Sequence, residues 1–293
     1  MPCFWGDAVS RFFVCCLAML TIVSSVAAEP MQVTVHGHAR TFLLTRPVGQ
    51  GPSPTIIMLH GGNSGADQEI RLSRLAQHGP QQGFAAVFPQ GRGGYWNFFP
   101  PGKENVLYRR FFLRHGGVPD DVTFLKMIVA ELVQRGISDP KRIYLAGRSL
   151  GGVMALRLAC VDAGSFAAIG LLISAMPDVT GSECQPAKPM PVLIINGTDD
   201  RVLPYRGERG ARGDILWPTQ RLVAFFRQLN GCDEPDQQSV LPGQQAQNIV
   251  IERSTRCSGG PVVLYSIVGG GHEVPAAFNA SQTLLDFLHD KMR

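Results

Sequence analysis

A serine bracketed by glycines lies where an apolar, strand-like run ends, within the segment RIYLAGRSLG at 142–151. A strand that turns into a helix within one residue strains the backbone of that residue, so its neighbours two positions away must be small. Gly147 and Gly151 meet this need. The segment predicts a nucleophile elbow that exposes the hydroxyl of Ser149 for acyl transfer. Such short strings also occur around purely structural serines, so the prediction depends on finding partners.

A nucleophilic serine requires a carboxylate that orients its base, and the run VLIINGTDDRVLP at 192–204 offers two. It has the form of a buried strand followed by a turn that contains Asp199 and Asp200. Aspartates in turns often only bond their own backbone. From the pattern alone either carboxylate could face a base.

The base candidate is His272, which ends the run VVLYSIVGGGH at 262–272. The predicted strand is followed by three glycines at 269–271, whose backbone freedom lets the turn position the imidazole of His272. The order Ser149, then an aspartate, then His272, each after a strand, is the chain order of α/β hydrolases. The remaining histidines lack such settings and are interpreted as surface or packing residues, apart from one: His36, His38, His78, His115 and His289.

That exception is His60, in the run MLHGGNSG at 58–65. Glycines after an early core strand allow close approach of the backbone to a substrate. We predict an oxyanion hole formed by the amides of Gly62 and Leu150, with His60 supporting the loop rather than taking protons. This chemistry implies neither a cofactor nor a metal ion.

The elements that must position these residues alternate along the chain. Apolar, strand-like runs fall at 32–36, 41–45, 55–59, 85–89, 142–146, 168–174, 192–196 and 262–267, and helical periodicity falls at 69–78, 120–135, 150–160, 219–229 and 281–292. Strands that are apolar throughout are buried on both faces of a parallel sheet. The sequence therefore predicts an α/β fold with a mostly parallel central sheet flanked by helices.

One segment does not fit this alternation. Residues 91–117 mix seven aromatic side chains with basic ones, and no strand or helix is predicted there. Long loops in compact domains are usually functional or disordered. The aromatic content predicts a pocket wall or lid, and surface padding is the alternative.

The first 28 residues predict an export signal. Arg11 precedes an apolar stretch at 12–26, and Val26-Ala27-Ala28 forms the cleavage motif. We expect cleavage near Ala28, a secreted or periplasmic protein and a single catalytic domain at 29–293 with no stable membrane anchor. An uncleaved anchor is the alternative.

The charge and the cysteine content limit which classes of protein the chain can belong to. The net charge of +4 is too small to indicate nucleic-acid binding. Four cysteines remain after the signal, and an even number in an oxidising compartment predicts disulfides. Three pairings are possible, and we favour Cys160 with Cys184 and Cys232 with Cys257. A zinc site is the weaker interpretation, because no close Cys-x-x-Cys spacing occurs.

Taken together, these features resemble the α/β-hydrolase superfamily, and within it the secreted esterases that include LpqC-like proteins, polyhydroxybutyrate depolymerases, feruloyl esterases and acetylxylan esterases of carbohydrate esterase family 1. The matching pieces are LHGG at 59–62, FPQG at 88–91, WN at 96–97, VPDDV at 118–122, the elbow, NGTDDRVLPY at 196–205 and GGGH at 269–272. The resemblance implies Asp200, not Asp199, as the triad carboxylate.

The resemblance also implies an ester substrate, and departures from the family pattern leave its acyl and alcohol groups open. Arg148 in the elbow and the residues after His272 differ from the usual motif. We expect a soluble or oligomeric ester, of polyhydroxybutyrate-oligomer, feruloyl or acetyl type, with Trp96, Arg148 and Tyr205 as substrate-binding candidates. The oligomeric state is not determined by the sequence.

Two alternatives to an esterase remain. A peptidase or transacylase would use the same triad. A ligand-binding protein on a hydrolase scaffold would instead use Arg206, Arg209 and Arg212, with the aromatic segment, to hold an anion. In the esterase interpretation these arginines lie on a solvated loop.

Overall fold

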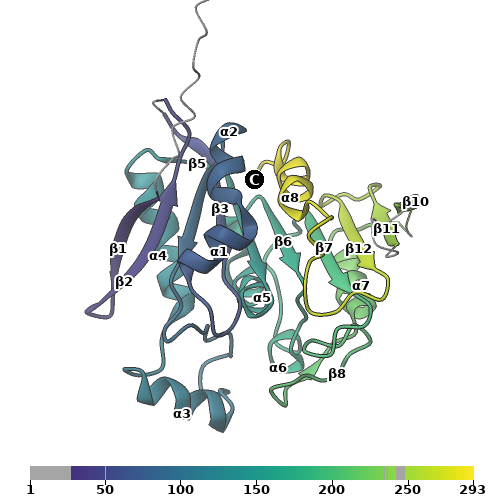
Figure 1. Ribbon diagram of the computed structural model, residues 1–293, viewed down its shortest axis with the longest axis horizontal. Helices are drawn as coiled ribbons and strands as arrows, with labels where there is room; N and C mark the ends of the chain where they lie inside the picture. Colours follow the sequence, from purple (N-terminus) through teal and green to yellow (C-terminus); the bar gives the residue numbers. More distant parts are fainter. Residues whose placement is uncertain (1–27, 50, 234, 236, 242–247) are drawn as a thin grey trace, which may run out of the picture.

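Ten strands form one central sheet in the computed structural model, which describes residues 28–293 except 50, 234, 236 and 242–247. The predicted export signal therefore lies outside the described residues, apart from Ala28. In spatial order the strands are β1 (Glu29–Val35), β2 (His38–Thr45), β4 (Ala85–Pro89), β3 (Ser53–Leu59), β5 (Ser138–Arg148), β6 (Ala168–Leu172), β7 (Val192–Gly197), β12 (Val262–Ile267), β11 (Ile249–Ser254) and β10 (Gln237–Leu241) (Figure 1).

The centre of the sheet is parallel and its edges are antiparallel. Each neighbouring pair from β4 through β3, β5, β6 and β7 to β12 is parallel. The β1–β2 hairpin closes one edge, and β11 and β10 close the other. Parallel strands need crossover connections, which here are the helices. The predicted fold class is confirmed.

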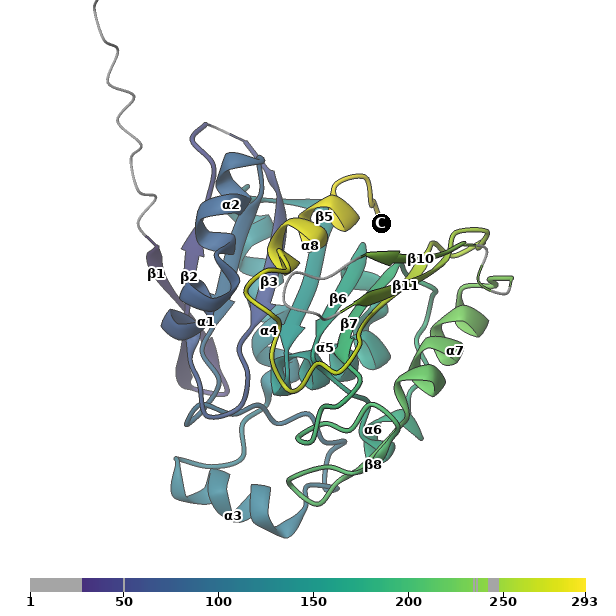
Figure 2. The same cartoon turned by 45° about the vertical axis from the view of Figure 1, so that its right-hand side comes forward.

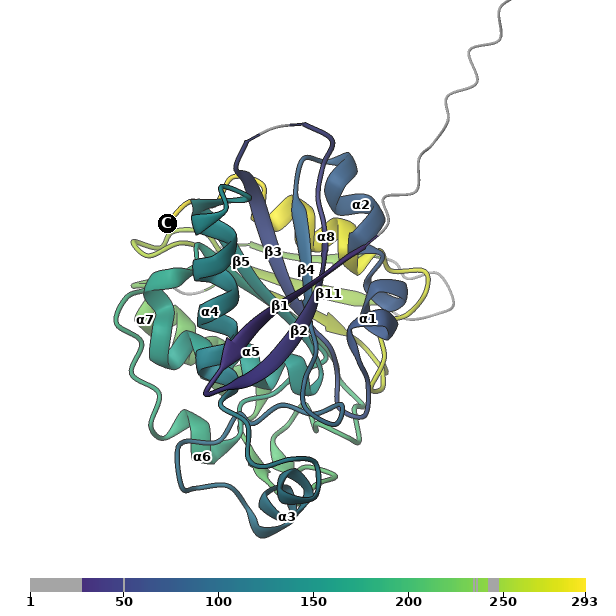
Figure 3. The same ribbon diagram turned by 90° about the vertical axis from the view of Figure 1, so that its left-hand side faces the viewer.

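Helices cover both faces of the sheet (Figure 3). One face carries α1 (Ala66–Ser73), α2 (Leu75–Gln81) and α8 (Ala280–Leu288), and the other carries α4 (Asp121–Gln134), α5 (Leu150–Asp162) and α7 (Thr219–Leu229). Neighbouring residues of a strand pack on opposite faces of the sheet. Ile56 packs in the hydrophobic cluster under α1, α2 and α8, and Ile57 packs in the cluster under α4, α5 and α7. This alternation explains why the central strands are apolar at every position.

Some elements differ from those predicted. The single helix expected at 69–78 is two helices, because Arg74 adopts the left-handed conformation (φ 54°) between α1 and α2. The aromatic segment contains α3 (Val106–Arg114), whose N-terminus is capped by Asn105. The sequence also missed the short α6 (Asp178–Gly181), the edge strands β10 and β11, and a small hairpin of β8 (Glu208–Arg209) and β9 (Ile215–Leu216).

Two disulfides join near neighbours in the sequence, in the pairing that the sequence analysis favoured. Cys160 at the end of α5 bonds Cys184 beyond α6, and Cys232 after α7 bonds Cys257 after β11. The first closes a loop beside the parallel core, and the second fixes the edge of the sheet. Along the described residues, no helix combines the length and the apolar character needed to span a membrane.

The parallel strands direct the loops that follow them to one end of the molecule. The arrows of β6 and β7 point toward the end where α3, α6 and β8 lie (Figures 1 and 2). Ser149 follows β5, and the runs with Asp200 and His272 follow β7 and β12. Three positions distant in the chain therefore meet at one edge of the sheet, where α/β folds bind ligands.

Candidate active site

Ser149 occupies a strained turn between β5 and α5. Its φ of 52° and ψ of −120° lie outside the conformations that side-chain-bearing residues usually adopt. The strain persists because the surroundings impose it: the Ser149 amide donates to the Leu172 carbonyl at 2.8 Å. A Cβ on Gly147 would lie 2.3 Å from the Gly151 carbonyl carbon, and one on Gly151 would lie 2.2 Å from the Leu59 oxygen. The glycines of the predicted elbow are therefore required sterically.

A continuous chain of hydrogen bonds joins the three residues predicted to do the chemistry. Ser149 Oγ lies 2.8 Å from His272 Nε2, and His272 Nδ1 lies 2.6 Å from Asp200 Oδ2. A carboxylate can only accept, so Nδ1 carries the proton and Nε2 is free to accept from the serine hydroxyl. Asp200 is buried, and its other oxygen accepts from the amides of Val202 and Leu203 at 2.7 and 2.9 Å.

The turns that carry Asp200 and His272 pack backbone against backbone. A Cβ on Gly197 would lie 2.3 Å from the Gly270 carbonyl oxygen. The Asp199 amide donates to the same oxygen at 2.9 Å, while the Asp199 side chain is exposed. Asp199 thus contributes its backbone to the joint between the turns, and Asp200 is the residue that meets the imidazole.

The loop with the predicted oxyanion donors runs beside the serine. Gly62 and Leu150 both line the same cleft as Ser149 and His272. A Cβ on Gly61 would come within 3.5 Å of Ser149 Cβ, so this loop contacts the elbow directly. Leu150 begins α5, where the first amides of a helix are free to donate. Both predicted amides are therefore near the serine, as stabilisation of an oxyanion would require.

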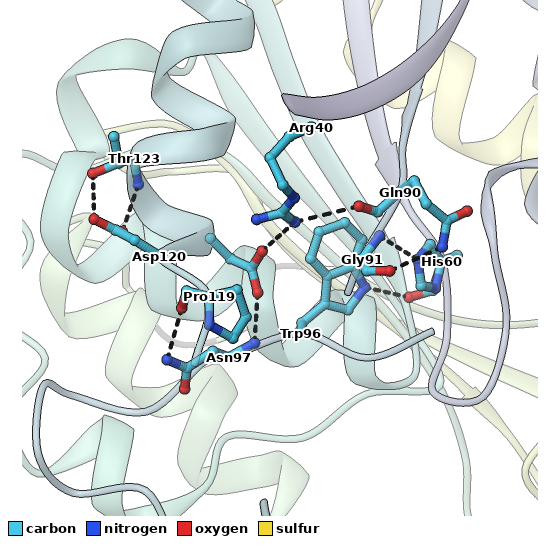
Figure 4. Close-up of polar contacts among 10 residues, drawn as sticks. Arg40, His60, Gln90, Gly91, Trp96, Asn97, Pro119, Asp120 and Thr123 are labelled. Carbon is cyan, nitrogen blue, oxygen red and sulfur yellow. Dashed lines mark hydrogen bonds and ion pairs between the residues drawn. The ribbon is translucent and has the colours of Figure 1, made fainter. Parts of the chain in front are cut away.

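His60 supports this loop by bonding two backbone segments, and Figure 4 shows its contact with Gly91. The Gly91 amide donates to His60 Nε2 at 2.9 Å, so His60 Nδ1 carries the proton and donates to the Gly61 carbonyl at 2.7 Å. Burial lowers the pKa of His60 to about 4, with the Gly61 bond opposing. The imidazole is neutral and fully engaged. It acts as a brace, as the sequence analysis expected, rather than as a base.

A buried ion pair anchors the segment after β4 (Figure 4). Arg40 donates to Asp121 at 2.6 Å, and the other carboxylate oxygen of Asp121 accepts from the Asn97 amide at 2.7 Å. Burial raises the pKa of Asp121, and the nearby Arg40 opposes this. The pair holds residues 90–97 behind the oxyanion loop. The sequence analysis noted Asp121 only as part of a family motif, because nothing local shows that Arg40 reaches it.

None of the three substrate-binding candidates has a side chain that lines the cleft beside Ser149. Trp96 is fully buried and donates to the His60 carbonyl at 2.8 Å. Tyr205 bonds its hydroxyl to Ser266 on β12 at 2.8 Å. Both side chains support backbone that carries the site.

Arg148 also turns away from the cleft. Its Nε donates to both carboxylate oxygens of Glu69 at 3.2 and 3.3 Å, joining the elbow to α1. Glu69 is completely buried, which raises its pKa to about 7, while Arg148 opposes the shift. The charge of Arg148 is therefore paired with Glu69 and does not face the cleft.

The cleft at the serine has a volume of about 180 Å³ and is walled by segments from distant parts of the sequence. The aromatic segment contributes Phe98 and Tyr108, so the pocket-wall interpretation of residues 91–117 is confirmed and surface padding is excluded for these two side chains. The sequence analysis missed further lining residues that local patterns could not reveal: Val153, Leu203, Asp214 and Leu216. Arg212, considered only in the ligand-binding alternative, lines the cleft as well.

The sheet order, the elbow and the hydrogen-bonded serine, histidine and aspartate define an α/β hydrolase. The chain matches the family described as Esterase PHB depolymerase over residues 42–202 and belongs to that family. Its relatives include NocK of Nocardia uniformis subsp. tsuyamanensis, whose name describes it as an esterase, at 29% identity over 86% of this chain and 76% of NocK. The protein is an esterase.

Other relatives are longer. Feruloyl esterase B of Piromyces equi is 30% identical over 76% of this chain, but the match spans only 40% of that enzyme. Among solved structures, an acetyl xylan esterase from Aspergillus awamori superposes with a TM-score of 0.61 at 13% identity, covering 89% of this chain and 99% of that one. At this identity the likeness establishes the shared fold.

Proposed function

We propose that this protein is an exported serine carboxylic-ester hydrolase that acts through an acyl-enzyme on soluble or oligomeric esters. The observation that carries the proposal is the hydrogen-bonded chain from Ser149 through His272 to Asp200, opening onto a cleft. A hydroxyl alone is a weak nucleophile at neutral pH, and this arrangement supplies the base and the group that orients it.

The reaction follows from the geometry. His272 Nε2 takes the hydroxyl proton as Ser149 Oγ bonds the ester carbonyl carbon, and the oxyanion lies between the amides of Gly62 and Leu150. Its collapse breaks the bond to the alcohol, which leaves with the proton from His272. A water molecule then gives a proton to His272 and bonds the acyl carbon; the bond to Ser149 Oγ breaks, Oγ takes the proton back from His272, and the acid leaves. Asp200 holds the imidazole tautomer throughout.

The shape of the cleft supports a small or oligomeric substrate. A volume of about 180 Å³ accommodates a short acyl chain or one aromatic ring. The side chains of Phe98 and Tyr108 line the same cleft as Ser149, so the site is recessed rather than flat. Acetyl, feruloyl and 3-hydroxybutyrate-oligomer esters are the classes we propose, in line with relatives named as a feruloyl esterase and a bifunctional acetylxylan esterase/xylanase.

Export is supported by two features. Residues 1–28 have the layout of a cleavable signal, and the folded chain contains two disulfides. Disulfides persist mainly in oxidising compartments. Sequencing the N-terminus of protein secreted by an expression host would test the proposal: a start near Glu29 supports it, and retention of residue 1 contradicts it.

The catalytic assignment is tested by Ser149→Ala. We expect it to lower kcat for 4-nitrophenyl acetate by at least about a thousandfold and to abolish labelling by a fluorophosphonate, because the hydroxyl of Ser149 is the group that His272 activates. The matched control is Ser165→Ala, since the Ser165 hydroxyl donates to Asp162 and Ser165 is not among the residues that line the cleft. Circular dichroism confirms folding of both variants.

The outcomes discriminate clearly. The mechanism is supported if the wild type and Ser165→Ala are active and labelled while Ser149→Ala is neither. Undiminished activity in that variant would overturn it. An ester panel of acetyl, butyryl, feruloyl and 3-hydroxybutyrate-dimer substrates then ranks the proposed classes by kcat/KM.

A further inference from the structure

We propose that Arg212 forms a carboxylate-binding subsite beside the serine, so that the preferred substrate is an ester that carries an anionic carboxylate as well as the scissile bond. This inference rests on the proposed function, since it concerns the same cleft. It adds a property that the triad alone does not supply: selection by charge.

Arg212 stands between two cavities. It lines the cleft that contains Ser149 and His272, and it also lines a neighbouring pocket of about 330 Å³. The second pocket is walled mostly by the aromatic segment: Tyr95, Leu107, Tyr108 and Phe111. A Cβ on Gly62 would lie 2.8 Å from Arg212 Nη2, so the guanidinium rests directly on the proposed oxyanion loop.

Aromatic side chains hold the guanidinium in place. Its Cζ lies 4.5 Å from the centre of the Tyr95 ring, and Nη1 donates to the Tyr108 hydroxyl at 3.1 Å. Tyr95 in turn packs edge-on against Phe111 at 4.7 Å. These contacts fix the plane of the guanidinium and leave further N–H groups for a ligand. A planar, fixed fork of donors matches a carboxylate.

Arg212 forms no salt bridge in the described part of the chain, although its charge interacts with that of Asp214. Among the described residues, no carboxylate lies within ion-pair distance of it, whereas Arg40 and Arg148 each have a buried acidic partner. Arg212 also stays accessible to solvent. An oriented cation beside a catalytic cleft, with aromatic walls and no carboxylate within ion-pair distance among the described residues, is suited to an anionic group on a substrate.

One acidic side chain faces the same cleft and sets the position of the bound anion. Asp214 lines the cleft and accepts from Asn105 Nδ2 at 3.1 Å. Burial raises the pKa of Asp214, while the bond from Asn105 and the charges of Arg212 and Arg209 oppose that shift. A substrate carboxylate therefore binds at the Arg212 edge, toward the aromatic pocket. Removing the charge of Asp214 should favour it.

The neighbouring arginines do not share this role. Arg209 donates to the Gly213 carbonyl at 2.6 Å, and neither Arg209 nor Arg206 lines the cleft or the aromatic pocket. The solvated-loop interpretation holds for Arg206, which is exposed. Of the three arginines, only Arg212 can contact a substrate attached to Ser149.

The experiment compares matched esters in full-length variants. The acyl-side pair is mono-4-nitrophenyl glutarate and 4-nitrophenyl valerate; the alcohol-side pair is 4-acetoxybenzoate and 4-methylphenyl acetate. The selectivity is the ratio of kcat/KM for the charged and neutral ester of a pair. We expect Arg212→Gln to lower that ratio about tenfold or more for at least one pair, as loss of a charge-assisted hydrogen bond implies.

Three comparisons separate charge recognition from a structural role. Arg212→Lys should recover part of the selectivity, and Asp214→Asn should change it in the opposite direction to Arg212→Gln. Arg206→Gln removes the same charge from the same loop and should leave the ratio unchanged. Added salt should weaken the wild-type selectivity, since part of this contact is exposed.

The result that overturns the subsite is an unchanged ratio for both pairs in Arg212→Gln, whether the two rates stay the same or fall together. In that case continued hydrolysis of the neutral esters by the wild type would leave the proposed function intact. Loss of all ester hydrolysis in the wild type would instead count against the proposed function itself.

Discussion

The turns that carry Ser149, Asp200 and His272 and the segments that wall the cleft are held in place by different means. The turns follow parallel strands and are locked by backbone contacts, such as those at Gly151 and Gly197. The wall segments, 95–112 and 201–216, are held by side chains, such as Arg212 against Tyr95. Backbone contacts place reacting atoms closely but tolerate no added atom, whereas side-chain contacts can be exchanged while the strand ends stay fixed. Chemistry and selectivity can therefore change separately.

The largest expected effect comes from adding one methyl group to the turns. Gly151→Ala places a Cβ 2.2 Å from the Leu59 oxygen, so either β3 or the elbow must shift. We expect kcat/KM to fall by at least about a hundredfold, since small displacements of reacting groups are costly, and stability to fall by about 1–3 kcal/mol. Ester kinetics and urea unfolding measure the two effects.

Gly164→Ala is the matched control, because a Cβ there meets nothing within 4 Å. It should behave like the wild type. If Gly151→Ala kept wild-type kinetics, the steric account of the elbow would be wrong.

The next effect concerns stability rather than activity and is expected from pH, through His60, which supports the oxyanion loop. Burial lowers the pKa of His60 from 6.5 to about 4, so between these values the unfolded chain binds a proton that the folded chain does not. The contribution of His60 to stability is therefore complete above pH 6.5 and is lost as the pH falls toward 4. The loss is on the order of 3 kcal/mol.

Glu69 changes stability with pH in the opposite direction over an overlapping pH range. Burial raises its pKa from 4.5 to about 7, so its contribution to stability is lost as the pH rises between these values. Urea unfolding of the wild type and of His60→Gln is measured at several pH values. The contribution of Glu69 is present in both proteins, so it cancels in the difference between their unfolding free energies. The difference in unfolding free energy between the two proteins should shrink as the pH falls from 7 to 4. A difference independent of pH would contradict a neutral, buried His60.

The smallest effect is expected where the sequence analysis had placed a substrate contact. Tyr205→Phe removes the hydroxyl bond to Ser266 and should cost about 1 kcal/mol of stability. Because Tyr205 does not line the cleft, KM for the short-chain esters should stay within about twofold of the wild type. Steady-state kinetics checks this, and a large rise in KM with kcat unchanged would return Tyr205 to the substrate site.

Local patterns predicted the fold and the proposed triad because both depend on short segments. Ser149 and His272 each follow an apolar run and lie within two residues of a glycine, and such runs indicate buried parallel strands. The ends of those strands necessarily lie at one edge of the sheet. The choice of Asp200 over Asp199 needed the family resemblance, and the structure shows why: the side chain of Asp199 is exposed, and its backbone instead bonds Gly270.

The sequence did not show the direction of a side chain that could turn more than one way. Arg148 lies next to the serine in sequence, yet its guanidinium reaches Glu69 on α1. Trp96 is in the aromatic segment, but its indole is fully buried against His60. Neither partner is adjacent in sequence, so neither direction could be predicted from local pattern.

The sequence by itself determined the class of chemistry, because strand, turn and glycine signals are local and their order along the chain fixes which groups meet at the sheet edge. Only the tertiary structure decided which side chains line the cleft beside Ser149. Arg212, Asp214 and Tyr108 meet in one cleft because a loop beyond β7 packs on a helix from the segment after β4. Contacts between such distant segments depend on the packing of the whole chain, and no local pattern records them.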